Sequence, residues 1–279
     1  MPQLTPHPPA TAGPVPTPLE PGEGLSSPSP RSTPTLSSPA SGGGLGRGPG
    51  EDRGAGQVSV IIPTLNAADT LELQLSALCA SELVKEVIVV DGGSRDETGA
   101  LARAAGARVV ETARGRGTQL GAGAAAAEGN WLLFLHADCR LDPSWEAAVH
   151  GFVGAPLASS RAGYFDFTLD DAAPAARRVE RLVAWRCRVL ALPYGDQGLL
   201  IARNLYDTVG GFAPLPLMED VDLVRRLGRR RLARIGCRCT SSARRYRRDG
   251  YWRRPLRNLC CLSLYFAGVP PQRIAQFYG

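Results

Sequence analysis

Short apolar runs alternate with segments of helical period from Val58 onward, and this alternation restricts the chain to one fold class. The apolar runs lie at 58–62, 87–90, 108–110 and 131–135. Between them come leucines at helical spacing over 71–78, a helix-like segment over 96–105 and an alanine-rich segment over 118–127. Strands that are apolar throughout are buried on both faces. We therefore expect an α/β domain with a mostly parallel central sheet and helices on both faces.

The first part of the chain has a different composition. Residues 1–50 hold 13 of the 23 prolines, with much Ser, Thr and Gly and almost no aromatic side chains. Such a segment buries too little apolar surface to offset the entropy of ordering it. The prediction is a disordered leader over 1–56 and a single domain over 57–279, of which about 225–279 is rich in arginine.

Positive charge is concentrated near the carboxyl end. The net charge is +6, and 15 of the 31 arginines lie between Arg225 and Arg273, where Asp249 is the one acid. This asymmetry predicts an anionic partner. The alternatives are phosphate groups, an acidic membrane surface and nucleic acid.

The amino terminus lacks the basic start and the apolar run of a signal peptide, and arginine interrupts every apolar stretch that approaches the length of a membrane span. Seven cysteines without a Cys-x-x-Cys pair favour reduced thiols over a zinc or disulfide framework. We therefore expect a cytoplasmic protein, either soluble or held peripherally at the inner face of the membrane.

Polar residues follow each predicted strand. Asn66 follows the first run, Asp91 the second, Arg116 the third, and His136 and Asp138 the fourth. Because ligands of open α/β sheets bind beyond the carboxyl ends of the strands, we predict one polar cluster there. The chain has neither a G-x-G-x-x-G motif nor a P-loop lysine, which disfavours dinucleotide enzymes and P-loop NTPases.

The acids near this edge admit both functional and structural interpretations. Asp91 suits hydrogen bonds from a ribose or a base, or it stabilises a turn. His136 and Asp138 are spaced to share a divalent cation on a diphosphate, or they form an ordinary surface loop. Asp220 or Glu219 suits a general base that deprotonates an attacking hydroxyl, or stabilises the first turn of a helix.

A basic run over 241–248 contains Arg245 and one aromatic side chain, Tyr246. Such a run is either a solvated face or a phosphate-binding surface, because guanidinium groups form paired hydrogen bonds with phosphate oxygens.

Taken in order, these motifs resemble the family 2 glycosyltransferases, which have the nucleotide-sugar-binding GT-A fold. The matching segments are 59–66, 89–96, 115–117, 134–138, 210–212, 219–223 and 225–227. Segments 136–138, 195–198, 216–220 and 242–246 are also similar to a bacterial subgroup called arsenosugar-biosynthesis-type glycosyltransferases.

The resemblance implies a role for each matching residue. Pro63, Asn66 and Asp91 would line the nucleotide pocket. Asp138 would hold Mn²⁺ or Mg²⁺ on the diphosphate, and Asp220 would be the catalytic base of an inverting displacement. The other residues predicted for the donor site are Gly92, Arg116, Gln119, Ala137 and Arg245.

The sequence departs from the family pattern at two places. Gly92 and His136 stand where many members have acids. Neutral His136 can still coordinate a cation, so we expect it to assist Asp138 and expect activity to fall at acidic pH.

The resulting prediction is metal-assisted transfer of a hexosyl or related group from a nucleotide-diphosphate donor to a hydroxyl of a small or lipid-linked acceptor. A sugar-phosphate nucleotidyltransferase is the first alternative, but residues 63–66 stand where such enzymes carry a Gly-rich loop. The second is an anionic-surface or nucleic-acid binding module in the arginine-rich region, where no nucleic-acid signature occurs. The segment 256–277 is expected to be a helix docked on the domain or on an acceptor's lipid.

Overall fold

The computed structural model describes residues 57–194 and 196–278, and the predicted leader over 1–56 lies outside these residues. The strands are β1 (Val58–Thr64), β2 (Val84–Asp91), β3 (Arg108–Glu111), β4 (Trp131–Phe134), β5 (Cys139–Leu141), β6 (Ala162–Leu169), β7 (Leu199–Ala202) and β8 (Leu232–Ser241). The helices are α1 (Ala68–Cys79), α2 (Thr98–Ala104), α3 (Arg116–Ala126), α4 (Trp145–Val153), α5 (Pro174–Leu190), α6 (Arg203–Thr208), α7 (Glu219–Leu227), α8 (Arg244–Asp249), α9 (Arg253–Phe266) and α10 (Pro271–Tyr278). Two short 3₁₀ turns are η1 (Ala158–Ser160) and η2 (Arg229–Arg231).

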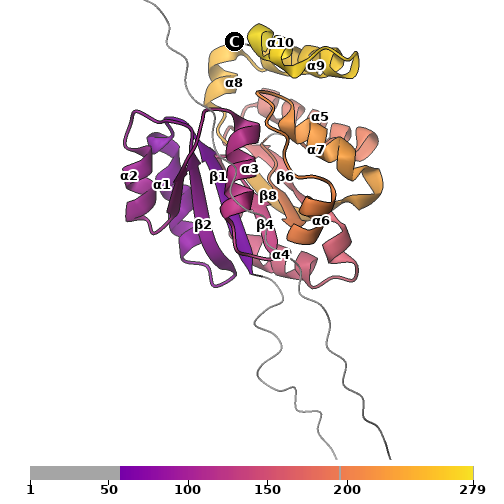
Figure 1. The fold of residues 1–279 in the computed structure, drawn as a ribbon. Coiled ribbons are helices and arrows are strands. Elements are labelled where there is room, and N and C mark those ends of the chain that lie inside the picture. The colour runs from indigo at the N-terminus through magenta and orange to yellow at the C-terminus, as the bar shows by residue number, and fades with distance from the viewer. Residues whose placement is uncertain (1–56, 195, 279) are drawn as a thin grey trace, which may run out of the picture. The chain divides into compact units, whose positions relative to one another are not determined.

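The strands form one sheet in the order β3-β2-β1-β4-β7-β6-β8-β5, of which Figure 1 labels β1, β2, β4, β6 and β8. β1 pairs in parallel with β2 and β4, β2 with β3, and β6 with β8. The pairings of β4 with β7, β6 with β7 and β5 with β8 are antiparallel. The prediction of a mostly parallel sheet is confirmed, with antiparallel insertions in its second half.

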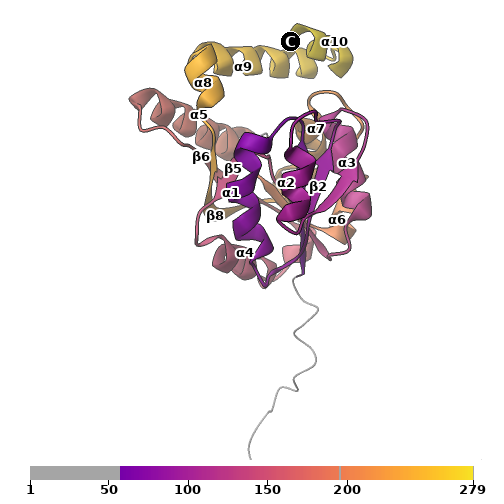
Figure 2. The same cartoon turned by 90° about the vertical axis from the view of Figure 1, so that its left-hand side faces the viewer.

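Helices lie on both faces of the parallel part. Helices α1 and α2 pack on each other and on β2, whereas α3 packs on β1 and β2, and Figure 2 shows β2 between α2 and α3. Right-handed crossovers produce this arrangement, because the chain moves outward from β1 to β3 and then returns to β4. The direction of strand order therefore reverses between β1 and β4.

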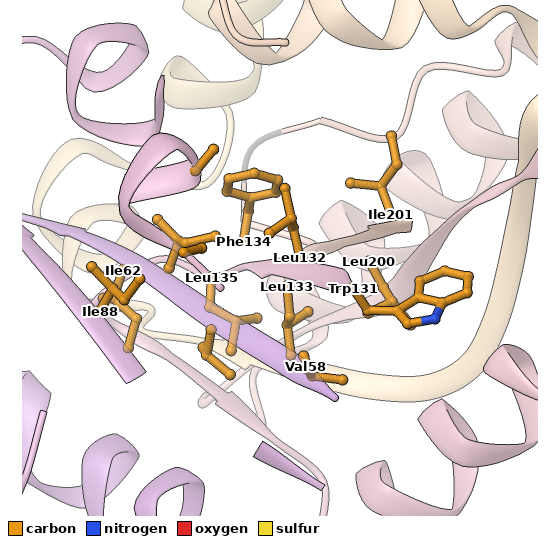
Figure 3. Packing of buried hydrophobic residues seen from close by; sticks show 14 of the residues in the cluster. Val58, Ile62, Ile88, Trp131, Leu132, Leu133, Phe134, Leu135, Leu200 and Ile201 are labelled. Carbon is orange, nitrogen blue, oxygen red and sulfur yellow. The ribbon is translucent and has the colours of Figure 1, made fainter. Parts of the chain in front are cut away.

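The apolar runs of the sequence form the core. Ile61 in β1, Ile88 in β2 and Leu133 in β4 have no exposed surface, and Figure 3 shows Ile88 and Leu133 among the packed side chains of these strands. Each such side chain stabilises the fold by roughly 1.5–3 kcal/mol relative to leaving it exposed. Strands covered on both faces explain why these runs lack apolar–polar alternation.

The carboxyl end differs in one respect from expectation. The single helix predicted over 256–277 is wrong, because two helices, α9 and α10, replace it. Gly268 takes a positive φ of 84° between them, and Pro270 and Pro271 have no N–H to continue a helix. Leu262 and Ile274 are buried in a cluster with residues of α7, so this end docks on the domain.

Among the described residues, no helix has the length and apolarity needed to cross a membrane. The seven cysteines are all free thiols.

Candidate functional site

A cavity of about 440 Å³ lies at the carboxyl ends of β1 and β4, and we call it the strand-end cavity. Its lining comes from the last two residues of β1, from the segments that follow β1, β3, β4 and β8, and from Pro216 before α7. Connections from β1 and into β4 run on opposite faces of the sheet, so a crevice remains beyond these two strand ends. A cavity therefore lies at the edge of the sheet where the polar cluster was predicted.

The lining of the strand-end cavity is strongly basic. It contains Arg114, Arg116, Arg244 and Arg245, and its one carboxylate is Asp138. Guanidinium groups pair with phosphate oxygens, and α3 begins at the cavity with its positive dipole end. A hard cation takes oxygen ligands, which Asp138 and bound phosphates would supply together. These residues fit a diphosphate with a divalent cation held by Asp138.

Asn66 is fixed in the lining by the turn that follows β2. It has a positive φ of 50°, its N–H donates to Ser94 Oγ at 2.8 Å, and its Oδ1 accepts the N–H of Arg95 at 2.8 Å. The buried Asp91 carboxylate accepts the N–H groups of Gly93 and Ser94 at 3.2 and 2.9 Å. Asp91 thus stabilises the turn over residues 92–95, and this turn fixes the position of Asn66. Asp91 itself does not line the cavity.

Gln119 ties together the ends of β1 and β2 beneath the cavity. Its side-chain amide donates to the carbonyl oxygens of Thr64 and Val90, both at 2.8 Å. A Cβ atom at Gly92 would lie 3.0 Å from the Gln119 side chain. Gly92 therefore leaves room for this connection but is not part of the lining.

A second cavity of about 260 Å³, the inner cavity, shares Arg116 and Arg245 with the first. Glu219 and Asp220, the first residues of α7, line it. Met218 precedes them with φ 68°, a conformation that costs of order 1–3 kcal/mol for a non-glycine residue. This strained residue starts α7 at the cavity, and such strain is typical of functional sites.

The two acids of α7 differ in environment. Glu219 is 1% exposed, and its Oε1 lies 3.0 Å from Arg116 Nε. Burial raises the pKa of the Glu219 carboxyl, and Arg116 offsets only part of the rise. Asp220 is partly exposed, and its Oδ1 accepts the N–H of Val221 at 2.8 Å. Asp220 is thus the more accessible of the two carboxylates.

A chain of charged contacts crosses the boundary between the cavities. Arg116 has only donors, so the facing Nε2 of His136 accepts its hydrogen bond. The proton of a neutral His136 is then on Nδ1, 2.9 Å from Asp196 Oδ1. This chain runs Asp196–His136–Arg116–Glu219, and both ring nitrogens of His136 have protein partners.

Arg116 is the point where the acids converge. Burial lowers its pKa, but Glu219, Asp220, Asp196 and Asp138 together raise it above the ordinary value. Asp138, which lines the strand-end cavity, and Asp220, which lines the inner cavity, thus both act on one guanidinium group. In residues 57–194 and 196–278, no three His, Cys, Asp or Glu side chains are grouped as a metal site, which leaves His136 as a cation ligand only a prediction.

The contacts that Asp196 makes in this series predict an acid-sensitive contribution to the stability of the fold. Burial raises the pKa of Asp196, but His136, Arg116 and Arg245 outweigh it, so the pKa is lowered. Because this pKa is lower in the folded than in the unfolded protein, the ionised carboxylate stabilises the fold at pH values above the unfolded pKa of about 3.9. The stabilisation is lost as the pH falls through the pKa of the folded protein. We expect Asp196→Asn to cost about 1–3 kcal/mol at pH 7 and less near pH 3, in urea unfolding. Asp207→Asn, at an exposed site on α6, should cost little throughout; an equal deficit for Asp196→Asn at both pH values would contradict the linkage.

The predicted residues divide into three groups. The strand-end cavity is lined by Pro63, Asn66, Arg116, Gln119, His136, Ala137, Asp138 and Arg245. Glu219 and Asp220 line the inner cavity, whereas Asp91 and Gly92 line neither and keep their donor-site assignment only as a prediction. Asp196 was not predicted, because it lies between α5 and β7, and its one sequence signal was the likeness of 195–198 to a subgroup motif.

Residues 59–157 match the family Glycosyl transferase family 2. The matched segment contains Asn66, Arg116 and Asp138, and it ends before Asp196 and α7. With the observed sheet order, the match confirms the predicted GT-A-like α/β fold.

Two curated relatives from Mycobacterium tuberculosis are similar to about a third of the chain. A PGL/p-HBAD biosynthesis glycosyltransferase is 37% identical over 105 residues, and the match covers 34% of this chain and 41% of the relative. A glucosyl-3-phosphoglycerate synthase is 35% identical over 92 residues, 29% of this chain and 28% of the relative. The chain thus matches less than half the length of each, and it is a homologue of glycosyltransferases.

A solved structure is similar over more of the chain. The glucosyl-3-phosphoglycerate synthase of M. tuberculosis, in complex with Mn²⁺, UDP and glucosyl-3-phosphoglycerate, aligns with a TM-score of 0.49 and 24% identity, covering 67% of this chain and 70% of that chain.

Proposed function

We propose that this protein transfers a glycosyl group from a nucleotide-diphosphate sugar to an acceptor hydroxyl. The observation that carries the proposal is the meeting of two cavities at Arg116, one with four arginines and Asp138, the other with Glu219 and Asp220. The family match over 59–157 covers most of the first cavity's lining. The donor would occupy the strand-end cavity and the acceptor the inner cavity.

Charge stabilisation is the first part of the mechanism. Negative charge grows on the nucleoside diphosphate as its bond to the sugar breaks, and Arg114, Arg116, Arg244 and Arg245 would offset it. A divalent cation bound at Asp138 would supply further Lewis-acid stabilisation of the same leaving group. The arginines also orient the diphosphate through paired hydrogen bonds.

Proton transfer is the second part. Asp220 would accept the proton of the acceptor hydroxyl as that oxygen attacks the anomeric carbon. Attack from the side opposite the diphosphate is a single displacement and inverts the configuration. The accessible position of Asp220 supports it over Glu219, whose carboxylate is buried against Arg116.

Donor binding can be tested without knowledge of the acceptor. We expect UDP with Mn²⁺ or Mg²⁺ to raise the unfolding temperature more than UDP or cation alone, because a ligand at 100 times its Kd adds about 2.7 kcal/mol. UDP and these cations are the first choice because the similar synthase was solved with them. Asp138→Asn should abolish the cation-dependent part of the shift, and Asp142→Asn, in the segment after β5, should retain it. The absence of a cation-dependent shift with all nucleoside diphosphates would contradict the proposal.

The product distinguishes the two transferase classes. A glycosyltransferase releases a nucleoside diphosphate, whereas a sugar-phosphate nucleotidyltransferase releases pyrophosphate. The proposal extends to a small or lipid-linked acceptor, a cytoplasmic location, which the free cysteines support, and the arsenosugar-type subgroup as a resemblance only.

A further inference from the structure

Large apolar side chains are exposed at helical spacing on two helices that flank the inner cavity. On α5 they are Leu182, Trp185 and Val189, which lie on one side of the helix. On α9 and its preceding residue they are Trp252, Leu256 and Leu259, exposed by 73, 67 and 57%. Single exposed apolar residues are ordinary, but two continuous stripes indicate a binding surface.

The two stripes belong to neighbouring helices. At the amino ends, the guanidinium carbon of Arg178 lies 5.7 Å from the centre of a ring of Trp252. At the carboxyl ends, Leu190 and Phe266 line one cavity of about 370 Å³. Figures 1 and 2 both place α9 at the same end of the domain as α5. We call the exposed faces of these helices the α5–α9 surface.

The α5–α9 surface is also basic. Arg178 of α5 and Arg253 of α9 are exposed, and no carboxylate within 57–194 or 196–278 forms an ion pair with them. Tryptophan, leucine and arginine side by side match the interfacial layer of a bilayer, where the rings enter the headgroup region and arginine pairs with lipid phosphates.

We propose that the α5–α9 surface docks on an anionic lipid bilayer, with Trp185 and Trp252 in the headgroup region. A second copy of the chain fits less well, because a face-to-face contact would oppose arginines of like charge. Nucleic acid fits less well because it leaves the exposed leucines in water. Docking goes beyond sugar transfer and does not rest on it.

The position of the surface gives docking a consequence for the inner cavity. Val183 and Arg186 of α5 and Arg254 and Asn258 of α9 line that cavity, on the same helices whose outer faces form the surface. A docked protein would therefore carry the proposed acceptor cavity beside the lipid.

Tryptophan emission tests the proposal on the full chain. Two of the four tryptophans, Trp131 and Trp145, are buried, so an emission change reports on Trp185 and Trp252. With phosphatidylcholine–phosphatidylglycerol vesicles we expect co-sedimentation, a blue shift and quenching by brominated lipid, all weakened by salt. Pure phosphatidylcholine should bind far less. Arg178→Gln with Arg253→Gln should weaken partitioning about five-fold per arginine.

Matched variants decide the result. Trp185→Gln with Trp252→Gln should abolish binding, whereas Leu157→Ser with Arg161→Gln removes an exposed leucine and arginine near η1, away from both helices, and should not. Thermal unfolding verifies that each variant is folded, and the arginine pair replaces the tryptophan pair if the latter unfolds.

Four outcomes would overturn docking. They are unchanged vesicle binding by both α5–α9 variants, equal binding to uncharged vesicles, a tryptophan-dependent dimer without vesicle binding, and RNA binding without vesicle binding. Nucleotide-dependent thermal shifts are measured without lipid, so failure of docking and failure of the transferase proposal remain distinguishable.

Discussion

Asp220→Asn should lower turnover by about 10²- to 10⁴-fold, the contribution usual for general base catalysis. Asparagine preserves the shape of the side chain and can still accept the N–H of Val221, which Asp220 accepts at 2.8 Å. It cannot take a proton from the acceptor hydroxyl. Steady-state release of nucleoside diphosphate measures the loss, and the thermal shift with nucleotide and Mn²⁺ should be retained because the strand-end cavity is unchanged.

Asp222→Asn is the matched control for this loss. Asp222 lies in the same first turn of α7, but its Oδ2 accepts from Arg226 Nη2 at 2.6 Å, and it lines neither cavity. Its substitution should leave turnover within a few fold of the unmodified protein. Near-normal transfer by Asp220→Asn would remove Asp220 from the role of base, and Glu219→Gln would then be the variant to measure.

Gly117→Ala should destabilise the domain by about 3 kcal/mol, at the upper end of the usual range for overpacking. An added Cβ at Gly117 would lie 2.2 Å from the carbonyl oxygen of Ala213 and 2.7 Å from the nitrogen of Leu215. Both contacts are with backbone, which cannot rotate away as a side chain would. Because this segment leads directly to Met218 and α7, we also expect weaker activity, and urea unfolding measures the stability loss.

Gly121→Ala makes the same change one turn further along α3. Its added Cβ would meet nothing closer than the carbonyl oxygen of Phe212 at 3.7 Å, an ordinary contact. Alanine is the better helix former, so this variant should be neutral or more stable by up to about 1 kcal/mol. Equal stability of the two variants would show that the close approach at Gly117 is not tight.

Local periodicity was sufficient to predict the first half of the domain. The runs at 58–62, 87–90, 108–110 and 131–135 correspond to β1 to β4, and the segment 118–127 corresponds to α3. Strand periodicity and burial are properties of a few consecutive residues, so they can be recognised without tertiary contacts. The strands β5 and β7, of three and four residues, and β6, whose residues alternate between buried and partly buried, were not predicted.

The residues that line the strand-end cavity were predicted where they follow strand ends, and the prediction was incomplete elsewhere. Asn66, His136 and Asp138 follow β1 and β4, and the reversal of strand order brings them into one cavity. Asp91 is the last residue of β2, but its carboxylate is turned into the loop of Ser94. Position at a strand end gives no information about side-chain direction, which depends on hydrogen bonds to the neighbouring loop.

The amino-acid sequence by itself determined which segments are buried and which edge of the sheet holds polar residues, because both follow from local pattern and the geometry of parallel strands. Tertiary structure alone decided that Asp196, His136, Arg116 and Glu219 form one chain of contacts, with separations of up to 103 residues. It also decided that α5 and α9 lie together. Such contacts depend on the paths of long connections and on the packing of many side chains, which no short window of sequence contains.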